Sequence, residues 1–304
     1  MRVALVTAGA RGLGRAVAEV LRDHGYTVAV TTRRADEGVR AWARADARHP
    51  EALVVPWDPL APDAGPDPVE VVLDRLGRLD VLVNNAGPYV RDPVGVGETS
   101  DAMFDAMFLG NVTAPFRLIR RALPAMRAAR YGRIVNVGFV GAGQAAGWAQ
   151  HGAYAAAKAA LASLTRTVAL EEARWGITCN MVCPSDIKGA AKEAPQGEGP
   201  EPTGGDVAHV VRFLLDERSR FLTGQVVEVS FGPGWGPVPG STTHPLAETV
   251  LPVGTPVWVP AWGERAVIRR TRQEAGEVWY WLEADQRQGE LPARSVRRAP
   301  DPGP

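Results

Sequence analysis

The stretch Thr7-Ala-Gly-Ala-Arg-Gly-Leu-Gly14 indicates how the chain folds at its start. An apolar run at residues 3–6 precedes it, and a helical pattern at residues 15–24 follows it. A glycine-rich turn between a strand and a helix presents backbone N–H groups where the helix dipole favours negative charge. Gly12 would let the backbone approach a ligand closely, and Gly14 would let the helix pack against the strand. This context predicts a phosphate-binding turn.

The alternation of apolar runs and amphipathic segments continues to residue 235. The expected elements are residues 26–31, 52–55, 69–76, 81–83, 102–129, 134–137, 154–175, 178–182, 207–215 and 226–229. Buried apolar runs separated by helices are typical of a doubly wound parallel sheet, and these runs lie too far apart for hairpins. We therefore expect an α/β Rossmann fold over residues 1–235.

The pattern changes after a Gly- and Pro-rich segment, which we interpret as a linker at residues 236–246. Short strand candidates at 257–259, 265–272 and 278–282 then follow, with four of the nine tryptophans between Trp258 and Trp281. Residues 289–296 resemble the last turn and strand of an SH3-like barrel. We expect a small all-β SH3-like barrel at residues 247–304, whose aromatic residues either form a peptide groove or fill the core or an interface.

Composition excludes several classes of partner. The 34 basic and 34 acidic side chains give no net charge, so we expect no electrostatic capture of nucleic acid or of an anionic membrane. No segment approaches the roughly 20 apolar residues that span a bilayer, and no signal peptide is evident, so a cytoplasmic location is expected. Cys179 and Cys183 have neither redox nor metal-ligand spacing. We expect them to be buried, and we expect no metal site.

A second motif, Asn84-Asn85-Ala86-Gly87, follows the apolar run at 81–83. Together with Thr7–Gly14 it resembles the Thr-Gly-x-x-x-Gly-x-Gly and Asn-Asn-Ala-Gly pattern of the short-chain dehydrogenase/reductase family. The resemblance extends from residue 2 to about residue 232 and departs at Ala8, where the family usually has glycine. It is closest in kind to 3-oxoacyl-[acyl-carrier-protein] reductase-like members. It implies a small-molecule substrate and a homo-oligomer, dimer or tetramer, paired through residues 102–129 and 154–175.

The end of the second expected strand indicates which dinucleotide binds. An NAD site places an acid there, whereas NADP needs positive charge for its 2′-phosphate. The strand ends in Arg33 and Arg34, and Arg11 in the glycine turn could reach the same phosphate. We therefore expect NADP. The expected cofactor-binding residues are Ala8, Gly9, Arg11, Gly12, Leu13, Gly14, Arg33, Arg34, Asp58, Asn85, Ala86, Gly87, Tyr154, Lys158, Pro184 and Ile187.

Tyr154 and Lys158 are four residues apart in a helical stretch, so their side chains share one face. The chain has only three lysines against 31 arginines, which suggests that this lysine is needed for more than charge. The resemblance implies that Tyr154 is the general acid and that Lys158 holds the nicotinamide ribose and lowers the phenol pKa. It also implies that Asn111 orders a proton-relay water. The expected reaction is NADPH-dependent reduction of a 3-oxoacyl-type or other ketone.

The family pattern has a serine after residues 134–138, and this sequence has Phe139. Loss of one preorganised donor to a developing oxyanion typically costs about 10²–10³ in rate. Gln144 and His151 are nearby donors that could substitute. Residues 189–205, rich in Gly and Pro, predict a mobile lid.

Three functions therefore stay open. The first is a carbonyl reductase that works without the serine. The second is a non-catalytic NADP(H)-binding sensor or scaffold with the C-terminal barrel as an interaction module. The third is an enoyl or pteridine reductase acting on a C=C or C=N bond.

Overall fold

A computed structural model describes residues 1–44, 46–197 and 202–230, together with the strands and one adjoining residue of a C-terminal part. The chain divides into two compact units, Met1–Pro237 and Val238–Pro304. Each unit is described by itself. The expected linker at 236–246 lies outside the described residues.

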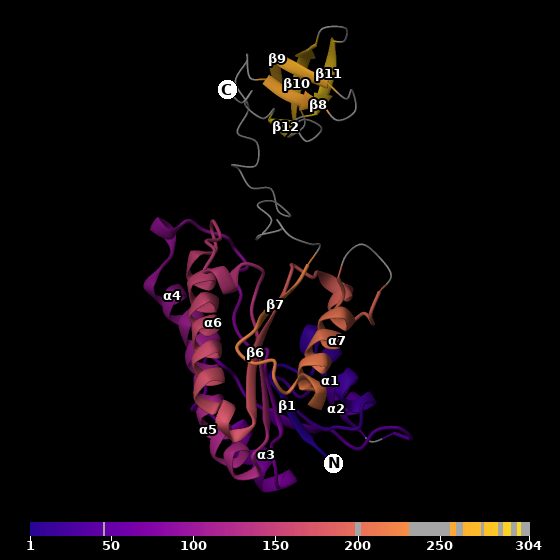
Figure 1. Ribbon diagram of the computed structural model, residues 1–304, viewed down its shortest axis with the longest axis vertical. Helices are drawn as coiled ribbons and strands as arrows, with labels where there is room; N and C mark the ends of the chain where they lie inside the picture. The colour runs from indigo at the N-terminus through magenta and orange to yellow at the C-terminus, as the bar shows by residue number, and fades with distance from the viewer. Residues whose placement is uncertain are drawn as a thin grey trace. The chain divides into compact units, whose positions relative to one another are not determined.

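A seven-stranded parallel sheet forms the centre of the first unit (Figure 1). Its strands are β1 (Val3–Val6), β2 (Thr27–Thr32), β3 (Leu53–Pro56), β4 (Val81–Asn84), β5 (Gly132–Val137), β6 (Ile177–Pro184) and β7 (Val226–Val229). The strand order is β3-β2-β1-β4-β5-β6-β7, with every neighbouring pair parallel. The predicted doubly wound Rossmann-like sheet is confirmed.

Helices cover both faces of this sheet (Figure 1). They are α1 (Gly12–Asp23), α2 (Glu37–Ala43), α3 (Pro68–Leu76), α4 (Asp101–Phe108), α5 (Ala114–Ala129), α6 (Gly152–Glu172) and α7 (Gly204–Leu215). Helices α1, α2 and α7 contribute to one apolar core, and α3, α5 and α6 to the other. No helix in the described ranges is long and apolar enough to cross a membrane.

Strand β1 illustrates how the sequence builds two cores from one sheet. Ala4 and Val6 pack into the core under α1 and α7, whereas Val3 and Leu5 pack into the core under α3 and α5. Successive side chains of a strand point to opposite faces, so a strand that is covered on both sides must be apolar throughout. Full burial of each such side chain stabilises the fold by about 1.5–3 kcal/mol.

Two regions differ from the expected pattern. The single helix expected at 102–129 is interrupted, because Leu109–Thr113 forms a π-helical turn (η2) between α4 and α5. Helix α2 was not anticipated; it begins at Glu37 and is capped by Asp36, whose side chain accepts a hydrogen bond from the Val39 N–H. Turns of the π type occur frequently at functional sites.

The segment 189–205, expected to be a mobile lid, contains local structure in its described part. Gly189–Lys192 forms a 3-10 turn (η5), and the chain after it packs on the start of α7. The Gly205 N–H donates to the Ala194 carbonyl at 2.9 Å, and the Thr203 hydroxyl donates to the Pro195 carbonyl at 2.8 Å. A Cβ at Gly204 would collide with the Lys192 carbonyl. The small residues that suggested disorder therefore allow close backbone packing.

The second unit contains an antiparallel sheet of five strands. They are β8 (Pro256–Val259), β9 (Glu264–Glu274), β10 (Glu277–Glu283), β11 (Gln288–Pro292) and β12 (Arg297–Arg298). Their order is β11-β10-β9-β8-β12. Tyr280 is buried and Trp281 is 39% exposed, as expected for neighbours on opposite faces of a strand.

Candidate active site

The predicted site residues of the first unit lie near the carboxyl ends of the parallel strands. The glycine turn follows β1, the Asn-Asn-Ala-Gly segment follows β4, and Phe139 follows β5. Strand β1 lies between β2 and β4, so the sheet extends to one side of β1 through β2 and β3 and to the other side from β4 onward. In open parallel sheets, ligands bind in the crevice at this switch in strand order.

Hydrogen bonds join the glycine turn to the Asn-Asn-Ala-Gly segment. The Thr7 hydroxyl accepts from the N–H groups of Asn85 and Ala86 at 2.9 and 2.8 Å. The Asn85 side-chain amide donates to the Thr7 carbonyl at 3.0 Å. A Cβ at Gly14 would lie 2.6 Å from that amide nitrogen, so only glycine fits there. The two motifs, distant in sequence, form one preorganised cradle.

Ala8 has a φ of +50°, a conformation that favours glycine. Its N–H donates to the Thr31 hydroxyl at 2.9 Å, a contact that holds the turn against the end of β2. A non-glycine residue in the left-handed region costs roughly 1–2 kcal/mol. The departure from the glycine pattern at Ala8 is therefore accommodated at some cost in stability.

A carboxylate of the chain itself contacts the predicted phosphate-binding turn. The Gly12 N–H donates to Glu193 Oε1 at 2.6 Å, and Arg15 Nη1 lies 4.0 Å from Glu193 Oε2. Negative charge is favoured at a helix N-terminus, which explains why the Glu193 carboxylate binds at the start of α1. Sequence reasoning missed Glu193, because only the packing of the segment after β6 brings it to α1.

The three predicted 2′-phosphate ligands lie in different settings. Arg33 and Arg34 directly follow β2, are exposed, and form no ion pair with an acid in the described ranges. Arg11 is also exposed but pairs with Asp36, the residue that caps α2. Sequence reasoning missed Asp36, although an acid before a short amphipathic segment is a helix-cap signal.

The other predicted cofactor residues lie at or after the carboxyl ends of β1, β3 and β6, at the same edge of the sheet. The Asp58 carboxylate accepts from the Leu60 N–H at 2.9 Å and closes a turn after β3. Pro184 ends β6, while the Ile187 side chain packs into the core, so Ile187 can face a ligand only through its backbone. Gly9 lets the turn lie close to β2, because a Cβ there would lie 2.7 Å from the Val30 side chain. The half-buried Leu13 packs against the core.

Tyr154 and Lys158 lie on α6 beside the end of β5. Lys158 is 4% exposed, and its ammonium donates to the Val137 carbonyl at 2.7 Å. Lys158 Nζ lies 5.7 Å from the centre of the Tyr154 ring. Burial lowers the pKa of Lys158 to about 8. Burial, with smaller contributions from Tyr89 and the Asp186 carboxylate, raises the pKa of Tyr154, so the phenol keeps its proton at neutral pH. The expected lowering of the phenol pKa by Lys158 was therefore wrong for this structure, because burial dominates.

Asn111 lies in the π-helical turn η2. Its side-chain amide donates to the carbonyls of Pro88 and Met107, both at 3.0 Å. Its Oδ1 atom is buried and accepts no hydrogen bond from the described residues. Such an acceptor costs free energy unless a water or ligand donates to it. Gly87 is required beside it, because a Cβ there would collide with Oδ1.

Phe139 belongs to a group of rings that we call the aromatic cluster: Tyr89, Phe139, Trp148, His151 and Tyr154. The Phe139 ring is 5% exposed and lies 5.3 Å from Trp148 and 5.7 Å from Tyr154, centre to centre. An apolar ring thus stands beside the Tyr154 phenol where the family pattern has a hydroxyl.

Neither proposed substitute for the serine is well placed. His151 is 6% exposed, with Nδ1 3.2 Å from the Ala149 carbonyl and Nε2 3.3 Å from the Tyr89 hydroxyl. Because a carbonyl only accepts, Nδ1 carries a hydrogen and both ring nitrogens are engaged. Gln144 is exposed on a 3-10 turn, Ala142–Gln144. Tyr89, which sequence reasoning did not single out, brings a second phenol ring to 5.2 Å from that of Tyr154.

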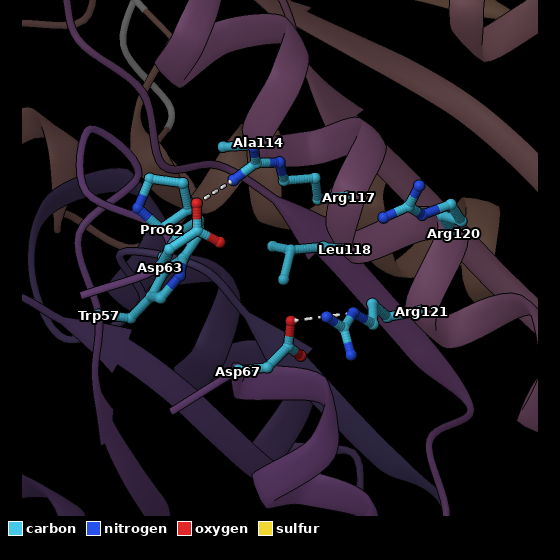
Figure 2. A pocket seen from close by; sticks show the side chains of 9 residues that line it. All are labelled: Trp57, Pro62, Asp63, Asp67, Ala114, Arg117, Leu118, Arg120 and Arg121. Atoms are coloured by element: carbon cyan, nitrogen blue, oxygen red, sulfur yellow. Dashed lines mark hydrogen bonds and ion pairs between the residues drawn. The ribbon is translucent and has the colours of Figure 1, made fainter. Parts of the chain in front are cut away.

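A separate cavity of about 200 Å³ lies between the loop after β3, the start of α3 and α5 (Figure 2). Arg117 pairs with Asp63 at 2.9 Å, and Arg121 lies 3.6 Å from Asp67. The acids offset the charge of these arginines, and none of the predicted catalytic residues lines the cavity.

Comparison with known proteins agrees with this geometry. The short chain dehydrogenase family model matches residues 2–198. YtkK of Bacillus subtilis (strain 168), by its name a candidate oxidoreductase, is 41% identical over 248 residues, covering 76% of this chain and 96% of YtkK. The 3-oxoacyl-[acyl-carrier-protein] reductase FabG of Vibrio cholerae serotype O1 is 34% identical, covering 76% of this chain and 96% of FabG.

A solved structure from Bacillus thuringiensis, by its name a candidate 3-oxoacyl-reductase, superposes with a TM-score of 0.70 at 40% identity. The superposition covers 75% of this chain and 96% of that one. The family match spans most of the first unit, including both glycine segments and the Tyr154–Lys158 pair. The chain therefore belongs to the short-chain dehydrogenase family of oxidoreductases.

Proposed function

We propose that the protein is an NADPH-dependent reductase of a carbonyl substrate, 3-oxoacyl-type or another ketone, with Tyr154 as general acid. One observation carries this proposal. The ammonium of Lys158 is anchored on the Val137 carbonyl beside the Tyr154 ring, at the carboxyl edge of the sheet. Lys158 pairs with no carboxylate among the described residues, and such burial of a charge is costly, so its retention in an arginine-rich chain favours a chemical role.

The residues of the cradle fit a dinucleotide. Gly9 and Gly14 let the turn pack tightly, because Cβ atoms there would collide with Val30 and with the Asn85 amide, and the Gly12 N–H already binds a carboxylate. The choice of NADP rests on Arg11, Arg33 and Arg34 around the end of β2. When bound, the reduced cofactor supplies the hydride.

The chain's own residues handle the proton. Tyr154 keeps its proton at neutral pH, because burial raises its pKa, and donates it to the oxygen as negative charge develops there. Lys158 provides the nearby positive charge that stabilises the resulting phenolate. The buried Oδ1 of Asn111 can accept from a water that helps to return the proton. Phe139 offers no hydrogen bond, so the substrate oxygen depends chiefly on Tyr154.

A second candidate function is a non-catalytic NADP(H) sensor, and Phe139 is the observation that favours it. Its ring occupies the place of a donor and contacts Tyr154 directly. An enoyl or pteridine reductase is the other alternative, since enzymes of these kinds work without the serine that Phe139 replaces.

We also propose a fold for the C-terminal unit and an oligomeric state for the protein. In the C-terminal unit, β8 to β11 follow one another in the sheet and β12 returns beside β8, an order that supports an SH3-like barrel over residues 247–304 after a 236–246 linker. In the first unit, Phe104, Phe116 and Leu170 are 45%, 43% and 83% exposed on α4, α5 and α6. These apolar side chains support a homo-oligomer, dimer or tetramer, paired through these helices.

Titration with NADPH and NADH tests the cofactor proposal. We would excite the tryptophans and follow energy transfer to the nicotinamide. We expect NADPH to bind at least tenfold more tightly than NADH, and we expect this preference to disappear in the Arg33→Ala, Arg34→Ala double variant. Equal affinities, or no binding of either nucleotide, would contradict the proposal.

A further inference from the structure

Three rings of the aromatic cluster surround the catalytic phenol. The rings of Tyr89, Phe139 and Trp148 lie 5.2, 5.7 and 6.0 Å from that of Tyr154, with interplanar angles of 81°, 46° and 71°. They come from the segments after β4 and β5 and from the loop before α6. Folding therefore assembles an aromatic wall at the place where a substrate carbonyl must meet Tyr154.

The wall has a buried layer and an accessible layer. Phe139 and His151 are 5% and 6% exposed, and both rings lie against Trp148, at 5.3 and 4.2 Å. Tyr89 is 45% exposed, and Trp148 is half-buried. The buried rings support the accessible ones, so Tyr89 and Trp148 present fixed aromatic surface to a ligand.

The charges beside the wall disfavour an anionic ligand. Burial chiefly raises the pKa of Tyr89 and of Tyr154, and the Asp186 carboxylate adds to both shifts. The ammonium of Lys158, 5.7 Å from the centre of the Tyr154 ring, is buried on the Val137 carbonyl. Lys188 lies 3.4 Å from Asp186, so its charge is already offset. A neutral ligand fits this setting.

We propose that the substrate is a neutral, planar carbonyl compound conjugated with an aromatic ring, which packs against Tyr89 and Trp148 while its oxygen meets Tyr154. This inference rests on the proposed reductase function. When bound, the reduced cofactor would supply a hydride to the carbonyl carbon and be oxidised, while the Tyr154 O–H bond would break and give its proton to the oxygen. The ketone would thus become an alcohol.

The replacement of serine by Phe139 has two effects that agree with this substrate class. It removes a polar donor, and it adds the ring that lies against Trp148 and Tyr154. Aromatic rings gain binding energy from one another beyond buried area, through edge-to-face and offset contacts. A flexible saturated chain gains none of this, so the wall selects flat rings.

The test compares 1-tetralone with 1-decalone, which have the same ten-carbon fused skeleton and differ in one aromatic ring. Their affinities are measured by calorimetry on the full-length protein, with and without NADP⁺. We expect 1-tetralone to bind about tenfold more tightly, a difference of about 1.4 kcal/mol. Equal affinities, or tighter binding of 1-decalone, would overturn the proposal.

Two variants of Tyr89 separate its ring from its hydroxyl. Tyr89→Phe keeps the ring, and we expect it to keep the tenfold preference. Tyr89→Leu removes the ring from an exposed position, and we expect the preference to fall to about threefold or less. Phe221→Leu, a change at a side chain that is 82% exposed and outside the cluster, is the matched control. An unchanged preference in Tyr89→Leu would contradict the assignment of the wall.

The proposed substrate class and the proposed reductase function are contradicted by different outcomes. If 1-tetralone binds preferentially but no ketone of a broad panel is reduced, the reductase proposal is contradicted and the wall still binds flat carbonyls. If saturated ketones are reduced and bind as tightly as 1-tetralone, the reductase stands and the inference about the substrate is wrong.

Discussion

We call the surroundings of the glycine turn the proposed cofactor side and those of Tyr154 the proposed substrate side, and the two depart from the family pattern to different degrees. On the cofactor side, the glycine turn and the Asn-Asn-Ala-Gly segment interlock through Thr7, and a side chain at Gly14 would break the contact. On the substrate side, a ring replaces the expected hydroxyl, and Tyr89 and Trp148 extend the change. Phosphate binding uses backbone groups, which constrain the sequence tightly, whereas a substrate wall can be rebuilt from side chains.

The largest effect is expected from restoring the hydroxyl on the substrate side. Phe139→Ser should raise kcat/KM for a saturated ketone by about 10². The same change should lower the free energy of unfolding by about 3–5 kcal/mol, because it leaves a cavity in the cluster. Phe139→Ala makes the cavity without the hydroxyl and is the control. If kcat/KM rises equally in both variants, the space available to the substrate, and not a missing hydrogen bond, limits kcat/KM in the wild type.

Disrupting the cofactor side should weaken nucleotide binding instead. Gly14→Ala places a Cβ 2.6 Å from the Asn85 amide nitrogen. Overpacking of this kind costs about 1–3 kcal/mol, so NADPH affinity should fall by about 5- to 150-fold. Gly97→Ala, where a Cβ would meet nothing within 4 Å, should bind normally in the same titration. Normal NADPH binding by Gly14→Ala would place the dinucleotide elsewhere.

The buried lysine predicts a pH dependence on the substrate side. Burial lowers the pKa of Lys158 to about 8, while that of Tyr154 is raised, so the ammonium loses its proton first as pH rises. We expect kcat/KM to fall about tenfold per unit above pH 8. Lys158→Arg keeps its charge, so its profile should lose this decline. A wild-type profile that stays flat from about pH 7 to pH 10 would exclude Lys158 as the titrating group.

The smallest effect concerns Arg11 on the cofactor side. Asp36→Asn removes the negative charge paired with Arg11 but keeps an oxygen to cap α2. Since exposed ion pairs contribute up to about 1 kcal/mol, NADPH affinity should rise about two- to fivefold, with NADH affinity unchanged. The control is Asp63→Asn, which frees Arg117 away from the crevice. An equal gain for NADH would show that Arg11 does not contact the 2′-phosphate.

Local sequence patterns predicted the sheet and the glycine turn, whereas contacts between distant residues were missed at the glycine turn and around Tyr154 alike. The parallel sheet follows from continuous apolar runs, and the glycine turn follows from local backbone geometry. Asp36 and Glu193 act through contacts with residues 25 and 181 positions away, and Tyr89 meets His151 across 62 positions. Such pairs carry no local periodic signal. The π-helical turn at Asn111 likewise depends on tertiary packing.

Single-turnover kinetics tests the central claim most directly. Protein saturated with NADPH is mixed with 1-tetralone, and oxidation of the bound nucleotide is followed by its fluorescence. The account predicts one rapid turnover in the wild type and a rate at least about 10²-fold lower in Tyr154→Phe, with NADPH affinity unchanged within about twofold. Equal rates in the two proteins would contradict the role of Tyr154. Bound NADPH that no ketone in a broad panel oxidises would identify a nucleotide sensor instead.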